Sequence, residues 1–435
     1  MTKREEPITS LLTFISEGVT PFHAVAACEK RLTDAGFSPL FEGEEWKLEA
    51  GKGYYVTRNR SSILAFRAPK DELSGFMIAA SHTDSPTFRV KHEPPSPLQG
   101  GLLRLNVEGY GGMLYSTWFD RPLSVAGRLT VNENGAIRTK LVKVDRDLLI
   151  IPSVAIHLNR KANEGVAYIP AIDLQPLVGS EGGDLLAVVA EAAGVSRDEI
   201  LSFDLSLYDR TPGRIFGLSS EFFSSPRIDD LKCVSGTLAG FLSTKTPKNG
   251  TVPVFCAFDN EETGSSTRQG ADSDFLSSCF SRIARAMGKE PETLYPSSFL
   301  VSADNAHARH PNHPELSDPA NAPDLNSGIV IKHAASQKYA TDAVSDAIFS
   351  QICRLSGAPF RHFHNRSDIP GGSTLGNIST AHLPVNSVDV GLPQLAMHSA
   401  CETAGVNDYA ALLTCMTRFF SSKVVCDADG SYRVE

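Results

Sequence analysis

The sequence is short of cysteine, of long apolar runs and of basic charge, and each shortage excludes a class of protein. Its eight cysteines in 435 residues are too sparse for a disulfide scaffold, and none forms a C-x-x-C pair. No apolar run approaches the roughly 20 residues of a membrane-spanning helix. Lys and Arg number 41 against 50 Asp and Glu, a formal charge of −9, which argues against nucleic acid as the main partner.

The start of the chain and its thiols indicate a compartment. The first residues carry charges of both signs, and the apolar stretch after them is short, so we expect no secretory signal. The cysteines are expected to be free thiols, mostly buried. We therefore predict a cytoplasmic protein with no membrane segment. The acidic balance also disfavours an acidic substrate at long range.

The pattern of apolar residues predicts an α/β frame with a β-rich insertion. Helical spacing predicts two helices within 7–36, and strands are expected at 54–56 and 62–66. Short β-like segments run from 91 to 218, with a hairpin at Asn134-Gly135 and one helix near 184–193. We predict a catalytic domain of residues 1–90 and 219–435, with a central mixed sheet, interrupted by a β-rich domain of residues 91–218.

Acids and a histidine follow three of the apolar runs. The run ending at Ser81 is followed by His82 and Asp84, a second run by 259–262, and a third by Asp304. Continuous apolar runs are typical of strands buried on both faces of a sheet, and ligands bind at the carboxyl ends of such strands. We therefore expect these side chains to meet at one edge of one sheet. A fourth run, 385–390, precedes His398.

Two histidines and several carboxylates, with no thiolate, are typical of zinc or manganese ligands. Two cations a few ångströms apart need a bridging carboxylate between them, because they repel each other. An extra acid beside a ligand acid, as in the Glu261-Glu262 pair, supplies a general base for a metal-bound water. Asp84, two residues after His82, can hold the other ring nitrogen of that histidine.

Six segments carry a resemblance to a known family. They are SHTDSP at 81–86, IPSVAIHL at 151–158, SPRIDDL at 225–231, FDNEETGS at 258–265, SADNAHARHPN at 302–312 and LPQLAMHS at 392–399. In this order and over nearly the whole chain, they resemble the aspartyl aminopeptidases, members of the M18 family of dinuclear zinc metallopeptidases. The resemblance implies a zinc-peptidase α/β/α catalytic domain and an inserted β-rich dimerisation domain.

The resemblance implies a role for each matched residue. His82 and Asp304 would bind one zinc, Glu262 and His398 the other, and Asp229 would bridge them. Glu261 would be the general base that activates a metal-bridged water, and Asp84 would orient His82. The cofactors implied are two Zn²⁺ per subunit, with Mn or Co able to substitute.

Assembly and substrate are implied in the same way. The family forms a dodecamer from dimers, and its insertion delivers a histidine, here His157, to the active site of the neighbouring subunit. Lys332 and Tyr339 would lie near the acidic side chain of the substrate, a peptide with N-terminal Asp or Glu. The expected activity is removal of that residue.

Several alternatives remain at this point. Asp230 stands where the family usually has Asn, so either Asp229 or Asp230 could bridge, although the register favours Asp229. His307, His310 and His313 could be a ligand set on a helix, but they are expected in a loop beside the site, since Pro311 and Pro314 break a helix. His362 and His364 are interpreted as exposed or structural residues rather than ligands. The stretch 109–112 is interpreted as a turn or bulge. The rival functions are a dinuclear zinc amidohydrolase acting on N-acyl amino acids and a non-catalytic assembly protein that binds cargo.

Overall fold

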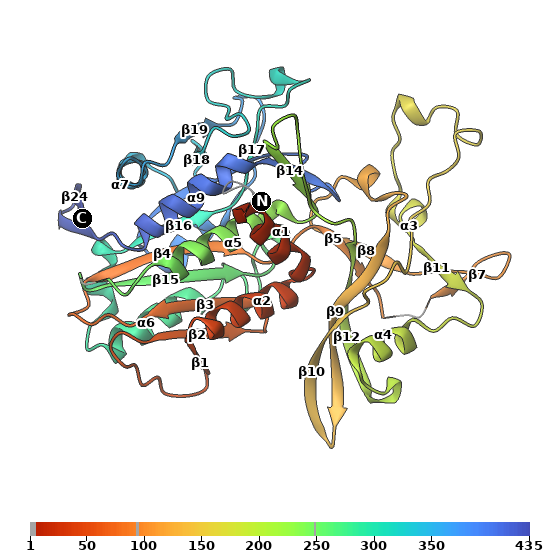
Figure 1. The fold of residues 1–435 in the computed structure, drawn as a ribbon, viewed down its shortest axis with the longest axis horizontal. Coiled ribbons are helices and arrows are strands. Elements are labelled where there is room, and N and C mark those ends of the chain that lie inside the picture. The colour runs from red at the N-terminus through yellow and green to blue at the C-terminus, as the bar shows by residue number, and fades with distance from the viewer. Residues whose placement is uncertain (1–5, 93–94, 248) are drawn as a thin grey trace.

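A computed structural model describes residues 6–92, 95–247 and 249–435. Its largest element is a nine-stranded mixed sheet (Figure 1). In spatial order its strands are β1 (Ser38–Leu40), β2 (Gly53–Arg58), β3 (Ser62–Arg67), β15 (Thr251–Phe258), β4 (Gly75–His82), β16 (Phe299–Ala303), β20 (Asn386–Gly391), β18 (Ile329–His333) and β19 (Phe360–His364). The predicted α/β fold with a central mixed sheet is confirmed.

Helices cover both faces of this sheet. One face packs against α1 (Glu6–Glu17), α2 (Pro21–Asp34), α5 (Ile228–Ser243), α7 (Ala343–Ser356) and α9 (Val406–Phe419), and the other against α6 (Phe275–Ala286) and α8 (Leu375–His382). Alternate residues of β4 divide between the two cores: Met77 and Ala79 join the first, and Phe76 and Ile78 the second. Because neighbouring side chains of a strand point to opposite faces, a strand in the middle layer must be apolar throughout.

The four central strands β15, β4, β16 and β20 run parallel to one another. Their carboxyl ends therefore lie at one edge of the sheet, as predicted for the three apolar runs that end at Ser81, Phe258 and Ala303. All eight residues of β4 and all eight of β15 are buried, which explains why each reads as a continuous apolar run.

A second region, here called the β-rich lobe, spans residues 87–209 and stands beside the main sheet (Figure 1). It holds a five-stranded sheet and a three-stranded sheet around a separate hydrophobic core. The first sheet contains β10 (Ala136–Lys143), β9 (Leu123–Glu133), β12 (Ile200–Asp209), β5 (Thr87–Val90) and β8 (Val107–Tyr110), and the second contains β11 (Leu177–Ser180), β7 (Leu102–Arg104) and β6 (Ser96–Pro97). The short helices α3 (Pro170–Asp173) and α4 (Leu185–Ala193) lie in the same lobe.

A small sheet joins distant parts of the chain near the carboxyl edge. Its strands are β13 (Arg214–Phe216), β14 (Phe222–Ser225), β22 (Glu402–Gly405), β21 (Pro393–Leu395) and β17 (Ala306–His307), and a hairpin of β23 (Val424–Ala428) and β24 (Ser431–Val434) follows α9. The tight connection between β21 and β22 contains His398, whose φ is 66°.

The local predictions hold where the structure describes them. The two helices predicted within residues 7–36 are α1 and α2, which cover 6–17 and 21–34. Strands β9 and β10 pair across Asn134 and Gly135, whose φ angles of 53° and 86° suit a two-residue hairpin. No helix of the described residues is long and apolar enough to span a membrane. The prediction about a secretory signal falls partly on residues 1–5, which lie outside the described residues.

Candidate metal centre

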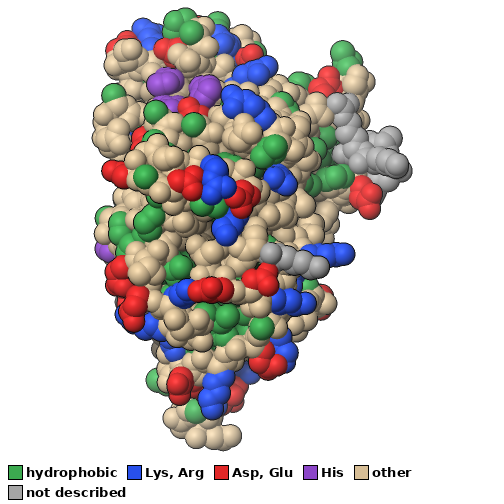
Figure 2. Space-filling view, turned by 90° about the vertical axis from the view of Figure 1, so that its left-hand side faces the viewer, with side chains coloured by type: hydrophobic (Ala, Val, Ile, Leu, Met, Phe, Trp, Pro, Cys, Tyr) green, Lys and Arg blue, Asp and Glu red, His purple; other side chains and the backbone are tan. Residues whose placement is uncertain are grey.

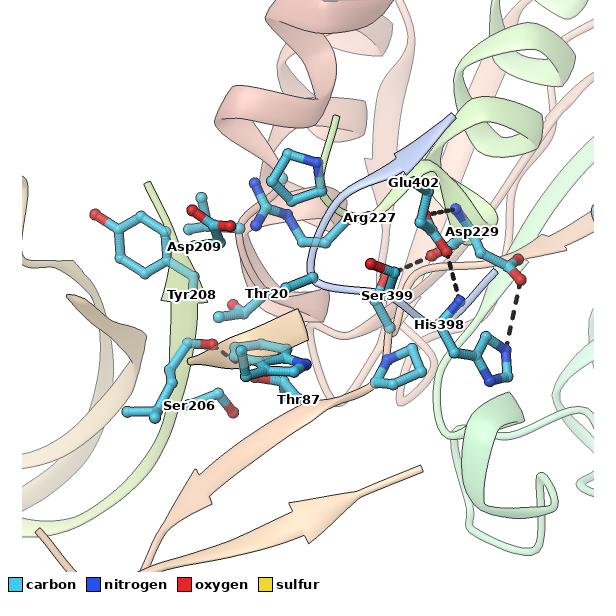
Figure 3. A pocket seen from close by; sticks show the side chains of 18 of the residues that line it. Thr20, Thr87, Ser206, Tyr208, Asp209, Arg227, Asp229, His398, Ser399 and Glu402 are labelled. Carbon is cyan, nitrogen blue, oxygen red and sulfur yellow. Dashed lines mark hydrogen bonds and ion pairs between the residues drawn. The ribbon is translucent and has the colours of Figure 1, made fainter. Parts of the chain in front are cut away.

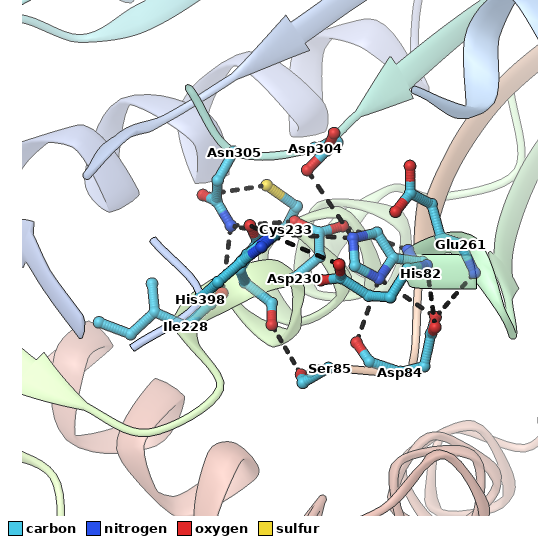
Figure 4. Close-up of polar contacts among 12 residues, drawn as sticks. His82, Asp84, Ser85, Ile228, Asp230, Cys233, Glu261, Asp304, Asn305 and His398 are labelled. Atoms are coloured by element: carbon cyan, nitrogen blue, oxygen red, sulfur yellow. Dashed lines mark hydrogen bonds and ion pairs between the residues drawn. The ribbon is translucent and has the colours of Figure 1, made fainter. Parts of the chain in front are cut away.

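Four of the predicted site residues come from the ends of three neighbouring strands. His82 is the last residue of β4, Glu261 and Glu262 form a 3₁₀ turn shortly after β15, and Asp304 follows β16 directly. Because β4 lies between β15 and β16, the three loops leave the same edge side by side. Figure 4 shows His82, Glu261 and Asp304 facing one space beyond that edge.

Asp229 reaches the same space from the start of α5. The turn of helix that holds it is irregular, with Arg227 at a φ of 57° and a cis peptide bond between Asp229 and Asp230. The Asp229 backbone N–H donates a hydrogen bond of 2.9 Å to the Glu402 carboxylate, and the Ser85 hydroxyl donates one of 2.7 Å to the Asp229 carbonyl. Both bonds fix the position from which the Asp229 side chain points into the centre.

The two carboxylate oxygens of Asp229 face two separate groups of side chains. Its Oδ1 lies 3.6 Å from His82 Nε2, which is also 3.7 Å from Asp304 Oδ1. Its Oδ2 lies 3.6 Å from His398 Nε2, which is also 3.4 Å from Glu262 Oε2. We call these groups the His82 half and the His398 half. A carboxylate shared between two sets in this way has the geometry of a bridging ligand.

Each half fits the size of a divalent cation. A tetrahedral zinc ion with ligands at 2.0–2.1 Å holds those ligand atoms about 3.3 Å apart, close to the spacings in both halves. The ligand atoms of Asp229, Glu262 and His398 lie within 4.8 Å of one another. The other carboxylate oxygen of Glu262, Oε1, is buried and has no hydrogen-bond partner in the described chain. Buried carboxylates are stabilised by cations, so the donor set fits zinc.

The charges of the centre shift the pKa values of its members. Burial raises the pKa of Glu261 to about 8 and raises that of Glu262 well above its ordinary range. Burial alone would lower the pKa of both histidines, but the surrounding carboxylates outweigh it: Asp230 and Asp229 raise the pKa of His82, and Asp229 raises that of His398 to about 10. The centre thus holds protons that divalent cations would replace.

The His82 half is held by Asp84 and by one residue of the β-rich lobe. His82 Nδ1 lies 3.1 Å from the carbonyl oxygen and 3.3 Å from the carboxylate of Asp84. That carboxylate accepts hydrogen bonds from the Tyr110 hydroxyl at 2.6 Å and from the backbone N–H groups of Glu261 and Glu262. Asp84 therefore connects the ring of His82 to the turn that carries both glutamates, as expected for a residue that orients a ligand.

The His398 half is held by the loop after β8 and by Glu402. His398 Nδ1 lies 2.5 Å from the carbonyl oxygen of Gly112, and the Leu114 N–H donates to the His398 carbonyl at 3.0 Å. The Glu402 carboxylate accepts from the backbone N–H groups of Asp229 and His398, at 2.9 and 2.8 Å (Figure 3). Burial raises the pKa of Glu402 to about 8. One side chain thus fixes the backbones of two ligands.

Asp230 stands where the resemblance implies Asn, and its carboxylate contacts the backbone of the His82 half. Its Oδ2 accepts the backbone N–H of His82 at 3.2 Å, and its Oδ1 accepts from Asn305 Nδ2 at 3.1 Å (Figure 4). The same amide group lies 3.3 Å from Asp229 Oδ1. Burial raises the pKa of Asp230 well above its usual range. No described contact joins Asp230 to His398, whereas Asp229 contacts both histidines.

Lys332 is buried next to the centre. Its Nζ donates to the Asn305 carbonyl at 2.8 Å and lies 3.3 Å from Asp304 Oδ2. It also lies 5.5 Å from the centre of the Tyr339 ring, and both side chains are almost fully buried. Burial would lower the pKa of Lys332, but Asp304 and other anions raise it, so the ammonium stays charged.

The structure does not bring every predicted residue to the centre. His157 is exposed in a loop of the β-rich lobe, and no contact described within this chain joins it to the ligands. His310 and His313 lie in exposed turns, as expected from the prolines around them, but His307 is the last residue of strand β17 and pairs with Gln394, so its placement in a loop was wrong. The prediction that His362 and His364 are exposed also agrees with the structure.

Sequence reasoning missed Tyr110, Gly112 and Glu402. The first two lie in the stretch that we interpreted as a turn or bulge, yet each contacts a different half of the centre. Glu402 lies four residues after His398 and at the start of β22. The one feature of the sequence that could have indicated a role for Glu402 is an acidic residue in a short strand close to a candidate ligand.

Comparison with known proteins agrees over almost the whole chain. The model of a family described as aminopeptidase I zinc metalloprotease (M18) matches residues 14–420. A "Probable M18 family aminopeptidase 2" of Clostridium novyi is 44% identical over 412 residues, which cover 92% of this chain and 95% of that protein. One of Clostridium acetobutylicum is 41% identical and covers 94% of this chain and 98% of its own length.

Solved structures agree with the fold. A chain in the cryo-EM structure of the Ape4 and Nbr1 complex has a TM-score of 0.93 and 36% identity, covering 96% of this chain and 86% of that chain. The structure of the S. cerevisiae mApe1 dodecamer has a TM-score of 0.85 and 27% identity, covering 96% and 97%. An M18 aminopeptidase from Thermotoga maritima, at 22% identity and a TM-score of 0.83, shares the fold.

Proposed function

The chain belongs to the M18 family of zinc metallo-aminopeptidases, and from this premise we propose that it removes N-terminal Asp or Glu from peptides. The observation that carries the proposal is the Asp229 carboxylate, whose two oxygens face two histidines and their partner acids. A positively charged Lys332 next to one of those acids supports the acidic preference.

We assign two zinc ions per subunit to this centre. His82 and Asp304 would hold one ion and Glu262 and His398 the other, with Asp229 between them. When bound, zinc polarises the scissile carbonyl and makes a water more acidic. A bound cation would also accept the lone pair of the uncharged α-amino group of the substrate.

Glu261 is proposed as the general base. One oxygen of its carboxylate lies within 4.8 Å of the ligand atoms of His82 and Glu262. Its backbone N–H donates a hydrogen bond to the Asp84 carboxylate. Its carboxylate accepts a proton from the attacking water and donates it to the leaving amine. Burial raises the pKa of Glu261 to about 8 in the metal-free centre. Neighbouring cations would lower it again, which favours the ionised carboxylate that a general base needs.

The acidic preference is proposed to depend on Lys332 and Tyr339. Lys332 offers a buried ammonium whose neighbours include the Asn305 carbonyl and the Tyr339 ring. A hydrogen bond between charged groups away from water contributes about 1.5–3 kcal/mol. Lys332→Met should therefore lower kcat/KM for an Asp reporter about 10- to 100-fold relative to a Leu reporter. Lys338→Met, which changes an exposed lysine nearby, is the control.

The β-rich domain of residues 91–218 is proposed to form a dimer that builds a dodecamer. Val154, Ile156 and Leu158 expose apolar side chains on the loop that carries His157, and such patches mark interfaces. A dodecamer is named for the S. cerevisiae protein. We propose that His157 enters the centre of a neighbouring subunit and stabilises the oxyanion there. His157→Ala should lower turnover without changing the zinc content of the protein.

A panel of reporters tests the activity. Asp-, Glu-, Leu- and Lys-aminoacyl reporters and an N-acetyl-Asp reporter are compared with and without chelator. We expect Asp and Glu reporters to react fastest, the acetylated one not at all, and chelator to stop the reaction. Faster hydrolysis of Leu or Lys reporters would overturn the acidic preference. Hydrolysis of the acetylated reporter alone would indicate the amidohydrolase, and a zinc-free inactive protein would favour the cargo-binding alternative.

A further inference from the structure

A second group of metal-binding side chains lies at the far edge of the main sheet. It consists of His333 at the end of β18, His362 in the edge strand β19, and Asp346 in the first turn of α7. Histidine side chains gather in one place on this side of the molecule (Figure 2). Among the described residues, the other groups with metal-binding geometry all belong to the centre described above. This group therefore stands apart from the proposed reaction.

The ligand atoms of this group have the spacing of a tetrahedral site. His333 Nε2 lies 3.2 Å from Asp346 Oδ2, and His362 Nε2 lies 3.1 Å from the same oxygen. All three ligand atoms lie within 4.8 Å of one another. Zinc with ligands at 2.0–2.1 Å requires a separation of about 3.3 Å. Two imidazoles and one carboxylate are also the ligand types that zinc prefers in sites with an open fourth position.

Neighbouring contacts hold His333 and Asp346 in place. The parallel pairing of β18 with β19 sets His333 opposite His364, and their rings stack at 5.2 Å with an angle of 10° between planes. The Ser350 hydroxyl donates to Asp346 Oδ1 at 2.8 Å. Oδ2 of Asp346 faces both rings, and His362 Nε2 also lies 3.2 Å from Oδ1. A ligand oriented by a second group in this way binds metal more tightly.

Simple hydrogen bonding is the alternative explanation of the same distances. It requires both rings to carry their proton on Nε2, so that Asp346 accepts from two donors. Elsewhere on the surface a carboxylate pairs with a single ring, as His382 does with Asp272 and His313 with Glu315. Convergence of two rings from two strands on one carboxylate distinguishes this group from those pairs.

We propose that His333, Asp346 and His362 form a further site for a transition-metal cation, with zinc the best fit. All three side chains are partly exposed, so an ion can enter from solvent. The bound ion would fasten edge strand β19 to α7. An edge strand has one partner strand only, and a clip from a helix restrains it. The proposal does not depend on which residues are assigned to catalysis.

The test uses the full chain stripped of metal and titrated with Zn²⁺ alone. Bound zinc is measured by equilibrium dialysis at low micromolar free zinc, for the wild type, His362→Gln and Asp346→Asn. We expect each variant to bind one ion per subunit fewer than the wild type. The control His382→Gln, which changes the histidine of a single pair, should bind as many as the wild type. Equal zinc binding by the wild type and both variants would overturn the proposal.

A second measurement needs no variant. Zinc should slow the carbethoxylation of His362 in the wild type at least tenfold, while His382 reacts at an unchanged rate. Peptide mass spectrometry reports both sites in one sample. Equal protection of the two histidines, or protection of neither, would overturn the proposal even if a variant failed to fold.

Discussion

The two halves of the metal centre are built differently. His82 is 1% exposed, and its partners Asp84, Asp304 and Asp229 come from strand ends and from the helix that packs on them. The His398 side chain is 32% exposed, and its Nδ1 depends on a carbonyl of the loop after β8. The first half follows mainly from the topology of the main sheet, and the β-rich lobe adds the Tyr110 hydroxyl that donates to Asp84. The second also requires the β-rich lobe to sit correctly against the small sheet, so changes in that lobe should affect it first.

Asp229→Ala should have the largest effect because Asp229 is the residue that the two halves share. Without it, neither histidine keeps its shared oxygen, and the two cations lose the anion between them. We expect loss of both zinc ions and of activity, measured by metal analysis and a reporter assay. Asp230→Asn, which restores the residue usual in the family, is the matched control and should retain zinc. The reverse result would make Asp230 the bridging acid.

Glu261→Gln should separate the chemistry from the metal ligands. The substitution keeps the size of the side chain and removes the proton acceptor, so turnover should fall about 10²- to 10⁴-fold while zinc content and thermal stability stay near those of the wild type. Rate and zinc content are measured on the same preparation. A rate close to that of the wild type would show that another group is the base.

Gly111→Ala should weaken the His398 half more than the His82 half. The new Cβ would lie 3.1 Å from the Cβ of Glu262, at a φ of 75° that favours glycine. The loop that supplies the Gly112 carbonyl would have to shift, and loss of such a partner costs about 10- to 100-fold in metal affinity. A stepwise zinc titration should show one weakened site.

Gly100→Ala is the control for that substitution. Gly100 has a φ of 84° in the same lobe, and a Cβ there would meet no atom within 4 Å. Gly100→Ala therefore places an alanine at a positive φ, as Gly111→Ala does, but without the contact to Glu262. If both variants lost zinc equally, the dependence of the His398 half on the loop would be wrong.

Tyr110→Phe should produce a smaller effect, and on the other half. It removes the hydroxyl that donates to Asp84, while the backbone donors of Glu261 and Glu262 remain. We expect zinc affinity at the His82 half to fall about tenfold, the lower end for a residue that positions a ligand. Tyr110 and Gly111 are neighbours in the chain but are assigned to different halves. If Tyr110→Phe weakened zinc binding at the His398 half, and Gly111→Ala weakened it at the His82 half, this assignment would be wrong.

The difference between the halves also explains what the sequence could predict. His82, Glu262 and Asp304 were recognisable because each follows a buried apolar run whose parallel neighbours end at the same edge. Gly112 contacts His398 across 286 residues of sequence through a backbone carbonyl, which no side-chain pattern reports. Glu402 contacts Asp229 across 173 residues of sequence by accepting its backbone N–H, which a side-chain pattern also does not report. The role of His157 came from resemblance alone and stays a prediction.

The pH dependence of the metal-free protein should give the smallest of these effects. The pKa of His398 is raised from 6.5 to about 10, so its contribution to stability is complete below 6.5 and is lost as pH rises through 10. Burial raises the pKa of Glu261 and of Glu402 from 4.5 to about 8, and protons held by these folded acids are also lost across this range. The free energy of unfolding should therefore fall between pH 6 and 9 without metal.

Zinc should remove most of that dependence, because the cation takes the place of the protons in both halves. Thermal unfolding of stripped and zinc-loaded protein at pH 6, 7, 8 and 9 measures the difference, and Tm of the stripped protein should decline more steeply. Asp84 and Asp229 have lowered pKa values, so their contribution to stability is complete above their ordinary pKa of 3.8 and is lost only as pH falls below it, outside this range. A stripped protein whose Tm is constant or rises from pH 6 to 9 would show that the centre does not hold excess protons, and the electrostatic basis for placing two cations there would fail.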